Sequence, residues 1–112
     1  MFDLKTQIWL DALRWRAEAG GAAFYVIKRG DSDFGSVLLK RLRADGMALL
    51  MAPGYAMSGE KVWTFPRGDV WMVERELDQY MTRRAEDDRD LWLIEIADRE
   101  GHHYLTERVE VS

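Results

Sequence analysis

A carboxylate inside a predicted apolar strand is the most conspicuous candidate for chemistry in this chain. Glu95 interrupts an otherwise apolar run, residues 93–96, in the strand that we expect to be most central in the sheet. Burying a carboxylate is costly unless a cation pairs with it. We therefore expect either a sheet face that opens to water around Glu95 or a buried ion pair. Arg16, which falls within the apolar arc of its predicted helix, is one candidate cation; the others are Lys28, Arg29 and Arg84.

Charged residues in two predicted turns supply a second candidate, a polar cluster at one edge of the sheet. Carboxylates gathered in this way can hold a divalent metal and serve an enzyme of unassigned type. The alternative for the first turn is structural, because Asp side chains in turns commonly accept hydrogen bonds from their own backbone. The residues of this candidate cluster are Arg29, Asp31, Asp33, Glu95, Asp98 and Arg99.

Other motifs that could support binding or catalysis lack residues that their chemistry requires. His102 and His103 are neighbours, and neighbours on a strand point to opposite faces, so they do not chelate one ion together. Gly54 and Gly59 have the spacing of a phosphate-binding loop, but Glu60 stands where that loop needs its lysine. We therefore predict no catalytic residue, no cofactor and no metal ligand from motifs.

Two helices and five or six strands are predicted to position these residues. The first helix has a very wide apolar arc, which predicts that it is covered on two sides. The fold class is therefore α+β: an antiparallel sheet of five or six strands with two helices, in the order α-β-β-β-(β)-α-β-β. We expect the helices at 6–19 and about 73–84, and the strands at 23–29, 36–43, 47–52, 62–65, 91–97 and 102–105.

The chain length of 112 residues predicts one domain, 1–112, in which residues 106–112 form a polar C-terminal tail. Asp3 or Thr6 is expected to cap the first helix. The segment 53–61 has the composition of a flexible loop, and the structure of residues 53–72 is the part that the pattern specifies least.

Apolar residues on both faces of the predicted sheet point to an assembly. In the strand at 23–29, Phe24 and Val26 point to one face and Tyr25 and Ile27 to the other. Two helices supply little apolar cover for two such faces. We therefore expect a homodimer in which a sheet face or the first helix is buried against its mate.

Composition excludes several classes of protein. The chain has 16 basic and 20 acidic side chains, a net charge of −4, which disfavours a dedicated nucleic-acid binder. Lys40, Arg41 and Arg43 form only a short basic run. The absence of cysteine excludes disulfides and cysteine-ligated metals. The start lacks the pattern of a signal peptide, and the longest apolar stretch, 47–53, is too short to cross a bilayer. We expect a cytoplasmic protein with no membrane association.

Three motifs spread over nearly the whole chain point to a family. They are Lys5-Thr6-x-x-Trp9, Arg29-Gly-Asp-x-Asp-x-Gly35 and Asp90-Leu-Trp-x-x-Glu-x-x-Asp-Arg-x-Gly101, of which the third is the most specific. Together they resemble the bacterial DUF1491 family, a domain of unknown function. The resemblance implies a bacterial cytoplasmic protein of this length, and it brings neither an established activity nor catalytic residues.

The leading functional interpretation is a non-catalytic interaction or regulatory module. The chain contains five Trp and six Met, side chains that offer adaptable contact surface as well as core bulk. The alternative is an enzyme that uses the acidic residues Asp31, Asp33, Glu95 and Asp98, with or without a divalent metal.

Overall fold

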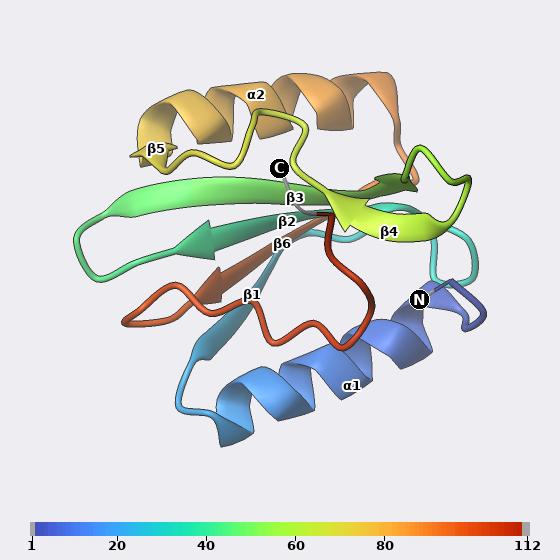
Figure 1. The fold of residues 1–112 in the computed structure, drawn as a ribbon, viewed down its shortest axis with the longest axis horizontal. Helices are drawn as coiled ribbons and strands as arrows, with labels where there is room; N and C mark the ends of the chain where they lie inside the picture. The colour runs from blue at the N-terminus through green and yellow to red at the C-terminus, as the bar shows by residue number, and fades with distance from the viewer. Residues whose placement is uncertain (1, 111–112) are drawn as a thin grey trace.

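The computed structural model describes residues 2–110 and shows a six-stranded sheet between two helices (Figure 1). One helix, α1, covers one face of the sheet, and the other, α2, covers the opposite face, so the molecule has three layers. The predicted α+β class is confirmed. The elements are α1 (Thr6–Ala19), β1 (Ala23–Lys28), β2 (Val37–Leu42), β3 (Met47–Tyr55), β4 (Lys61–Thr64), β5 (Met72–Val73), α2 (Glu74–Asp87) and β6 (Trp92–Ala97).

The interior strands of the sheet come from opposite halves of the chain. The strand order is β1-β6-β2-β3-β4, and the short β5 pairs with β3. β6 lies between β1 and β2, antiparallel to β1 and parallel to β2. The expected purely antiparallel sheet was therefore wrong, and the sheet is mixed. The reason is that β6 is apolar on both faces and takes an interior position, while residues 29–36 pass over its end and join the two strands that flank it.

Each face of the sheet packs against its own helix. On one face, Trp9 and Leu13 of α1 pack against Ile94 of β6, among other strand residues. On the other face, Leu77 and Met81 of α2 belong to a second apolar cluster. Both faces therefore have a helix of their own, but Tyr25, Val26 and Ile27 of the edge strand β1 are exposed, and the expected homodimer stays a prediction.

The C-terminal segment lies against the sheet. Residues 102–105 were expected to form a strand and do not, and Tyr104 has a φ of 60°, which a strand does not accommodate. The N–H of Trp63 donates to the carbonyl of Arg108 at 2.9 Å, and the N–H of Glu110 donates to the carbonyl of Trp63 at 2.8 Å. The predicted tail is thus docked on β4 over residues 108–110, because this segment satisfies backbone groups that an edge strand leaves open. Residues 111–112 lie outside the described part of the chain.

Most predicted elements are present, with changes at their ends. β3 continues to Tyr55, so Pro53 and Gly54 belong to a strand rather than to a loop. No side chain caps α1, which begins after Lys5, because the Thr6 hydroxyl donates to a carbonyl elsewhere. The predicted cover on the outer side of α1 is also missing among residues 2–110, since its outward apolar residues are exposed. Neither of the helices in the described residues combines the length and apolarity that a membrane span requires.

Candidate functional site: a rigid loop beside a hollow

The structure does not bring the predicted polar cluster together. Its residues in the first turn lie beside the N-terminus of α1. Those after β6 lie at the opposite end of the sheet, because β1 and β6 run antiparallel. Glu95 lies between the two ends, on the face covered by α2. The two separated groups are Arg29, Asp31 and Asp33, and Asp98 and Arg99.

Glu95 pairs with a lysine of the neighbouring strand, which lies directly opposite it in the parallel register. The Nζ of Lys40 is 3.0 Å from Glu95 Oε1, 2.8 Å from Glu74 Oε2 and 2.6 Å from Asp78 Oδ1. Lys40 is only 3% exposed. Burial works to lower the pKa of Lys40, but the three carboxylates outweigh burial and raise that pKa. We call these four residues the Lys40 cluster.

Arg16, the expected partner of Glu95, lies on the other side of the sheet. Its Nε donates to the carbonyl of Tyr104 at 3.0 Å. The predicted Arg16–Glu95 pair does not form, because alternation along β6 directs Glu95 toward α2 rather than α1. Among residues 2–110, no group of three or more His, Asp or Glu is arranged to hold a metal ion.

Asp98 is the centre of a second polar network. Its Oδ1 accepts a hydrogen bond from Tyr104 Oη at 2.6 Å, and its Oδ2 accepts from the backbone N–H groups of Glu100 and His102 at 3.1 and 3.0 Å. Burial opposes ionisation, but these hydrogen bonds outweigh it and lower the pKa of Asp98 to about 2. The Nδ1 of His102 lies 3.0 Å from the same Oδ2.

The Asp98–His102 pair has the arrangement of the orienting half of a general acid–base site. A carboxylate on one ring nitrogen fixes the imidazole tautomer and leaves the other nitrogen to exchange a proton. Here the His102 side chain is exposed, and its Nε2 lies 3.7 Å from a second carboxylate, Glu100. Neither partner is a serine or cysteine nucleophile. The pair can therefore move a proton, and it does not form a covalent intermediate by itself.

The loop between β1 and β2 is held by side chains from three parts of the chain, and we call residues 30–35 the Phe34 loop. Asp31 Oδ2 accepts a hydrogen bond from the backbone N–H of Phe34 at 2.7 Å, as expected for an Asp in a turn. Trp92 Nε1 donates to the carbonyl of Asp31 at 2.7 Å. Thr6 Oγ1 donates to the carbonyl of Gly35, also at 2.7 Å. Buried groups thus fix the conformation of the loop.

Close backbone packing holds the Phe34 loop from its other sides. A Cβ at Gly30 or at Gly35 would lie 2.2 Å from the carbonyl oxygen of Asp90, so the path of the loop requires glycine at both positions. The first two N–H groups of α1 donate to carbonyls of the same loop at 3.2 and 2.9 Å. The N-terminus of α1 is therefore occupied by the loop and is not open to an anion.

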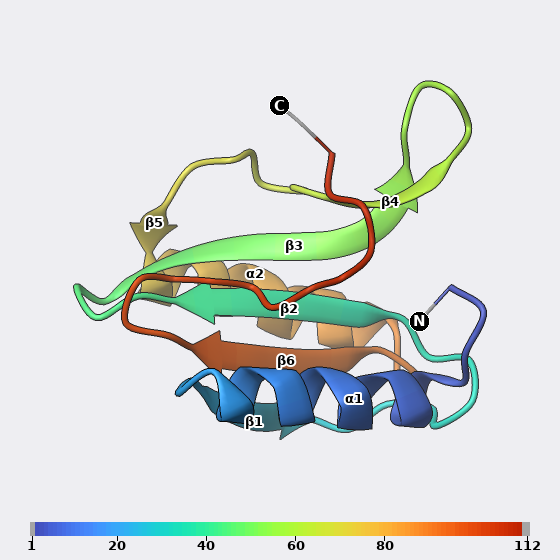
Figure 2. The same cartoon turned by 60° about the horizontal axis from the view of Figure 1, so that its bottom comes forward.

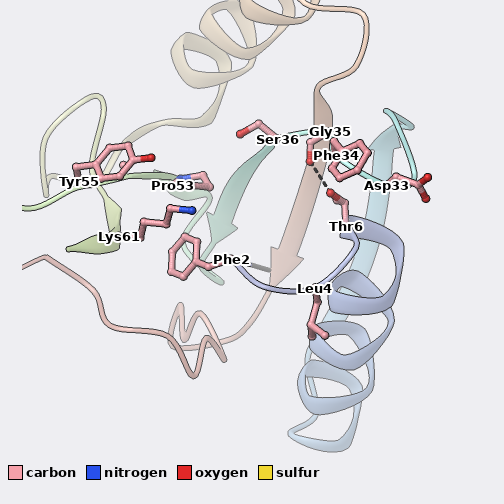
Figure 3. Close-up of a pocket in the computed structure, with 11 residues that line it drawn as sticks. Phe2, Leu4, Thr6, Asp33, Phe34, Gly35, Ser36, Pro53, Tyr55 and Lys61 are labelled. Carbon is pink, nitrogen blue, oxygen red and sulfur yellow. Dashed lines mark hydrogen bonds between the residues drawn. The ribbon is translucent and has the colours of Figure 1, made fainter. Parts of the chain in front are cut away.

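The Phe34 loop presents an aromatic ring to solvent. Phe34 is 89% exposed. Beside it lies a hollow of about 390 Å³, formed by the loop, the residues before α1 and the β3–β4 hairpin (Figure 3). Leu4 and Tyr55 add exposed apolar surface to its rim, and Lys61 places an ammonium there. We call Leu4, Phe34, Tyr55 and Lys61 the rim of the hollow.

The side chains of the basic run Lys40, Arg41 and Arg43 make contacts within the chain. Lys40 belongs to the Lys40 cluster. Arg41 Nε donates to the carbonyl of Gly101 at 2.7 Å, and Arg43 makes two hydrogen bonds to Asp45, the shorter at 2.7 Å. These groups do not form a basic face that could track a phosphate backbone.

Three residues of these sites were not predicted from the sequence as site residues. Lys40 stands in the apolar strand β2, but its partners are recognisable only once β6 is placed beside it. Tyr104 lies in a segment that was expected to be a strand. Phe34 carried an available signal, since it is a large apolar residue in an otherwise polar turn.

These features define a small α+β protein with a mixed sheet between two helices and an apolar-rimmed hollow at one end. The chain belongs to the DUF1491 family, because the family model, described as "Protein of unknown function (DUF1491)", matches residues 4–106. The resemblance stated from the three sequence motifs is thereby confirmed.

Solved structures of similar proteins agree with this assignment. A crystal structure of a DUF1491 family protein from Caulobacter crescentus CB15 is 44% identical, covers 96% of this chain and 99% of that chain, and has a TM-score of 0.87. An NMR structure of a DUF1491 family protein from the same bacterium is 42% identical, with coverages of 96% and 97% and a TM-score of 0.83. The solution structure of protein Atu0922 from A. tumefaciens is 25% identical, with coverages of 97% and 98% and a TM-score of 0.76. No curated protein matches the chain.

Proposed function

We propose that the protein is a non-catalytic binding module that takes an apolar side chain of a partner protein into the hollow beside Phe34. The observation that carries the proposal is the 89% exposure of Phe34 on a loop that buried side chains hold in place. An exposed aromatic ring on a mobile loop can fold back onto the protein. Phe34 has no such freedom, so its ring remains available for contact, and aromatic residues are enriched at protein interfaces.

The chemistry of the rim specifies the partner. Leu4, Phe34 and Tyr55 surround the hollow with apolar surface, and Lys61 adds a positive charge at one side. A partner segment with a large apolar side chain next to a carboxylate matches both features. The Lys61 ammonium then serves mainly to orient the segment, because exposed ion pairs contribute little affinity.

Peptide binding measured by NMR tests this proposal. A library of short peptides containing an apolar residue beside Asp or Glu is selected against the protein, and the selected peptides are titrated into labelled protein. We expect shifts concentrated on the rim of the hollow, and we expect Phe34→Ser to weaken binding at least tenfold while a matched variant at another exposed apolar residue, Val70→Ser, does not. Shifts that map elsewhere, or equal binding by Phe34→Ser, would contradict the proposal.

A second candidate function is general acid–base catalysis at His102. The observation that favours it is the Asp98 network, which fixes the imidazole ring at the protein surface. The acidic site first considered, with Asp31, Asp33, Glu95 and Asp98, is not assembled, so the second candidate rests on His102 alone. Hydrolysis of activated esters by the wild type that is absent in His102→Gln would support it. Equal rates for the two proteins would remove it.

We also propose that the protein works in the bacterial cytoplasm. Support comes from the absence of cysteine and from the bacterial origin of the similar solved structures. Fractionation of cells that carry a tagged chain tests the location, and recovery in the membrane or periplasmic fraction would contradict it.

A further inference from the structure

The outer side of α1 carries a second apolar stripe. At about 100° per residue, positions 8, 12, 15 and 19 fall on one side of the helix, opposite the buried Leu13 and Ala17. Ile8 is 54% exposed and Trp15 is 72% exposed, and the two alanines between and after them are also exposed. Figure 2 shows α1 in front of the sheet with no other element across its outer side. We call Ile8, Ala12, Trp15 and Ala19 the outer stripe.

The outer stripe is complementary to itself when a second helix runs antiparallel. Its spacings are four, three and four residues, so the pattern reads the same in both directions. Its sizes alternate large, small, large, small, so reversal places each large residue against a small one. In a single register, Ile8 faces Ala19 of the second copy and Trp15 faces Ala12 of the second copy. Alternation of large and small residues at facing positions is what close helix packing requires.

The charges beside the outer stripe agree with the same register. Asp11 and Arg14 lie on the same flank of α1, the flank opposite to the one that carries Arg16. In the antiparallel register, Asp11 of one copy comes within reach of Arg14 of the other. A parallel pair would instead set Trp15 against Trp15, with no small residue to receive the indole. Size thus favours the antiparallel orientation, and the positions of Asp11 and Arg14 are compatible with it.

We propose that two copies of this chain associate through antiparallel contact of their α1 outer stripes, around a two-fold axis level with residues 13 and 14. The contact is isologous, as expected of a two-fold dimer. Two facing helices of this length bury less than the roughly 1,200 Å² of a stable interface, so the dimer is weak, with a dissociation constant on the order of 10–100 μM. This inference does not depend on the proposed partner binding at the hollow.

Cysteine cross-linking tests the register, since the natural chain contains no cysteine. The variants Ile8→Cys and Ala19→Cys are mixed at 200 μM and exposed to a mild oxidant. We expect a disulfide-linked heterodimer in the mixture and almost none from Ile8→Cys alone, because the two copies of position 8 are about 16 Å apart along the axis. An exposed cysteine on the other helix, Thr82→Cys, measures cross-linking by random collision. Yield in the mixture no higher than with that control, or self-linking of Ile8→Cys, overturns the proposal.

Sedimentation equilibrium tests the association itself. The weight-average mass of the wild type is expected to rise toward twice the chain mass between 5 and 500 μM (roughly the range that spans the expected constant). Trp15→Ser should remain monomeric over the same range, while Val70→Ser should associate as the wild type does. Both positions are exposed, so neither change threatens folding. A wild type that stays monomeric, or a Trp15→Ser variant that associates equally, overturns the proposal.

Discussion

Replacing Lys40 by methionine tests the physical basis of the Lys40 cluster. Methionine matches the length of the lysine stem, so the change removes the charge and the three hydrogen bonds with little change of packing. The side chains of Glu74 and Asp78 are 37% and 49% exposed and can turn toward water. The loss of their contacts with Lys40 therefore changes the free energy of unfolding little. The Glu95 side chain is only 14% exposed and is left as a buried charge without its cation. We therefore expect Lys40→Met to lower the free energy of unfolding by about 3 kcal/mol, which is the lower end of the cost of breaking a buried pair.

The double variant Lys40→Met with Glu95→Met removes both buried charges and separates the pair from the rest of the cluster. We expect it to recover about 2 kcal/mol relative to Lys40→Met alone, because the uncompensated carboxylate is gone. Urea unfolding at pH 7, followed by fluorescence of the buried tryptophans, measures the wild type, Lys40→Met and the double variant. Equal stabilities of the single and double variants would refute the reasoning.

Further predictions concern Asp98 and the Phe34 loop. The pKa of Asp98 is lowered to about 2 in the folded protein against about 3.9 unfolded, so its stabilisation is present above pH 4 and is lost as the pH falls through 2. Because its partners Glu100 and His102 are exposed, the loss should be about 1–2 kcal/mol in acid unfolding curves, and Asp98→Asn should not show it. Gly35→Ala forces its Cβ against the backbone of Asp90 and should lower stability by more than about 2 kcal/mol, in contrast to Gly59→Ala, where the space is open and only the backbone preference is lost. Thr6→Val leaves the buried Gly35 carbonyl without its donor, which should cost about 1–2 kcal/mol in urea titrations, and a change below 0.3 kcal/mol would contradict the role assigned to this bond.

Local patterns in the sequence were sufficient to predict most of the helices and strands. The apolar periodicity before Gly20 and Gly21 predicted α1 with both ends as observed, and the short apolar run at 91–97 predicted β6. The pairing of the strands was not accessible in this way. No local pattern shows whether β1 pairs with β2, the next strand in the chain, or with β6, the last one, because both pairings bury the same residues.

The candidate site was less predictable for the same physical reason. The need of Glu95 for a cation follows from its apolar neighbours, but the identity of the cation depends on which strand lies beside β6, and that strand is β2 with Lys40. The docking of residues 108–110 depends on the open edge of β4, which is a property of the assembled sheet. The exposure of Phe34 depends on hydrogen bonds from Thr6 and Trp92, which are distant in sequence from the loop and from each other.

The insertion of β6 between β1 and β2 has a consequence for how the chain is made. While the ribosome is still adding residues before 92, β1 has no neighbour to pair with, and α1 has only part of the surface on which it rests. Productive folding therefore waits for nearly the whole chain to emerge, and contacts of such long sequence separation form slowly. A nascent or truncated chain that stops short of residue 97 exposes the backbone groups of two strands, and it becomes a target for chaperones, proteases and aggregation.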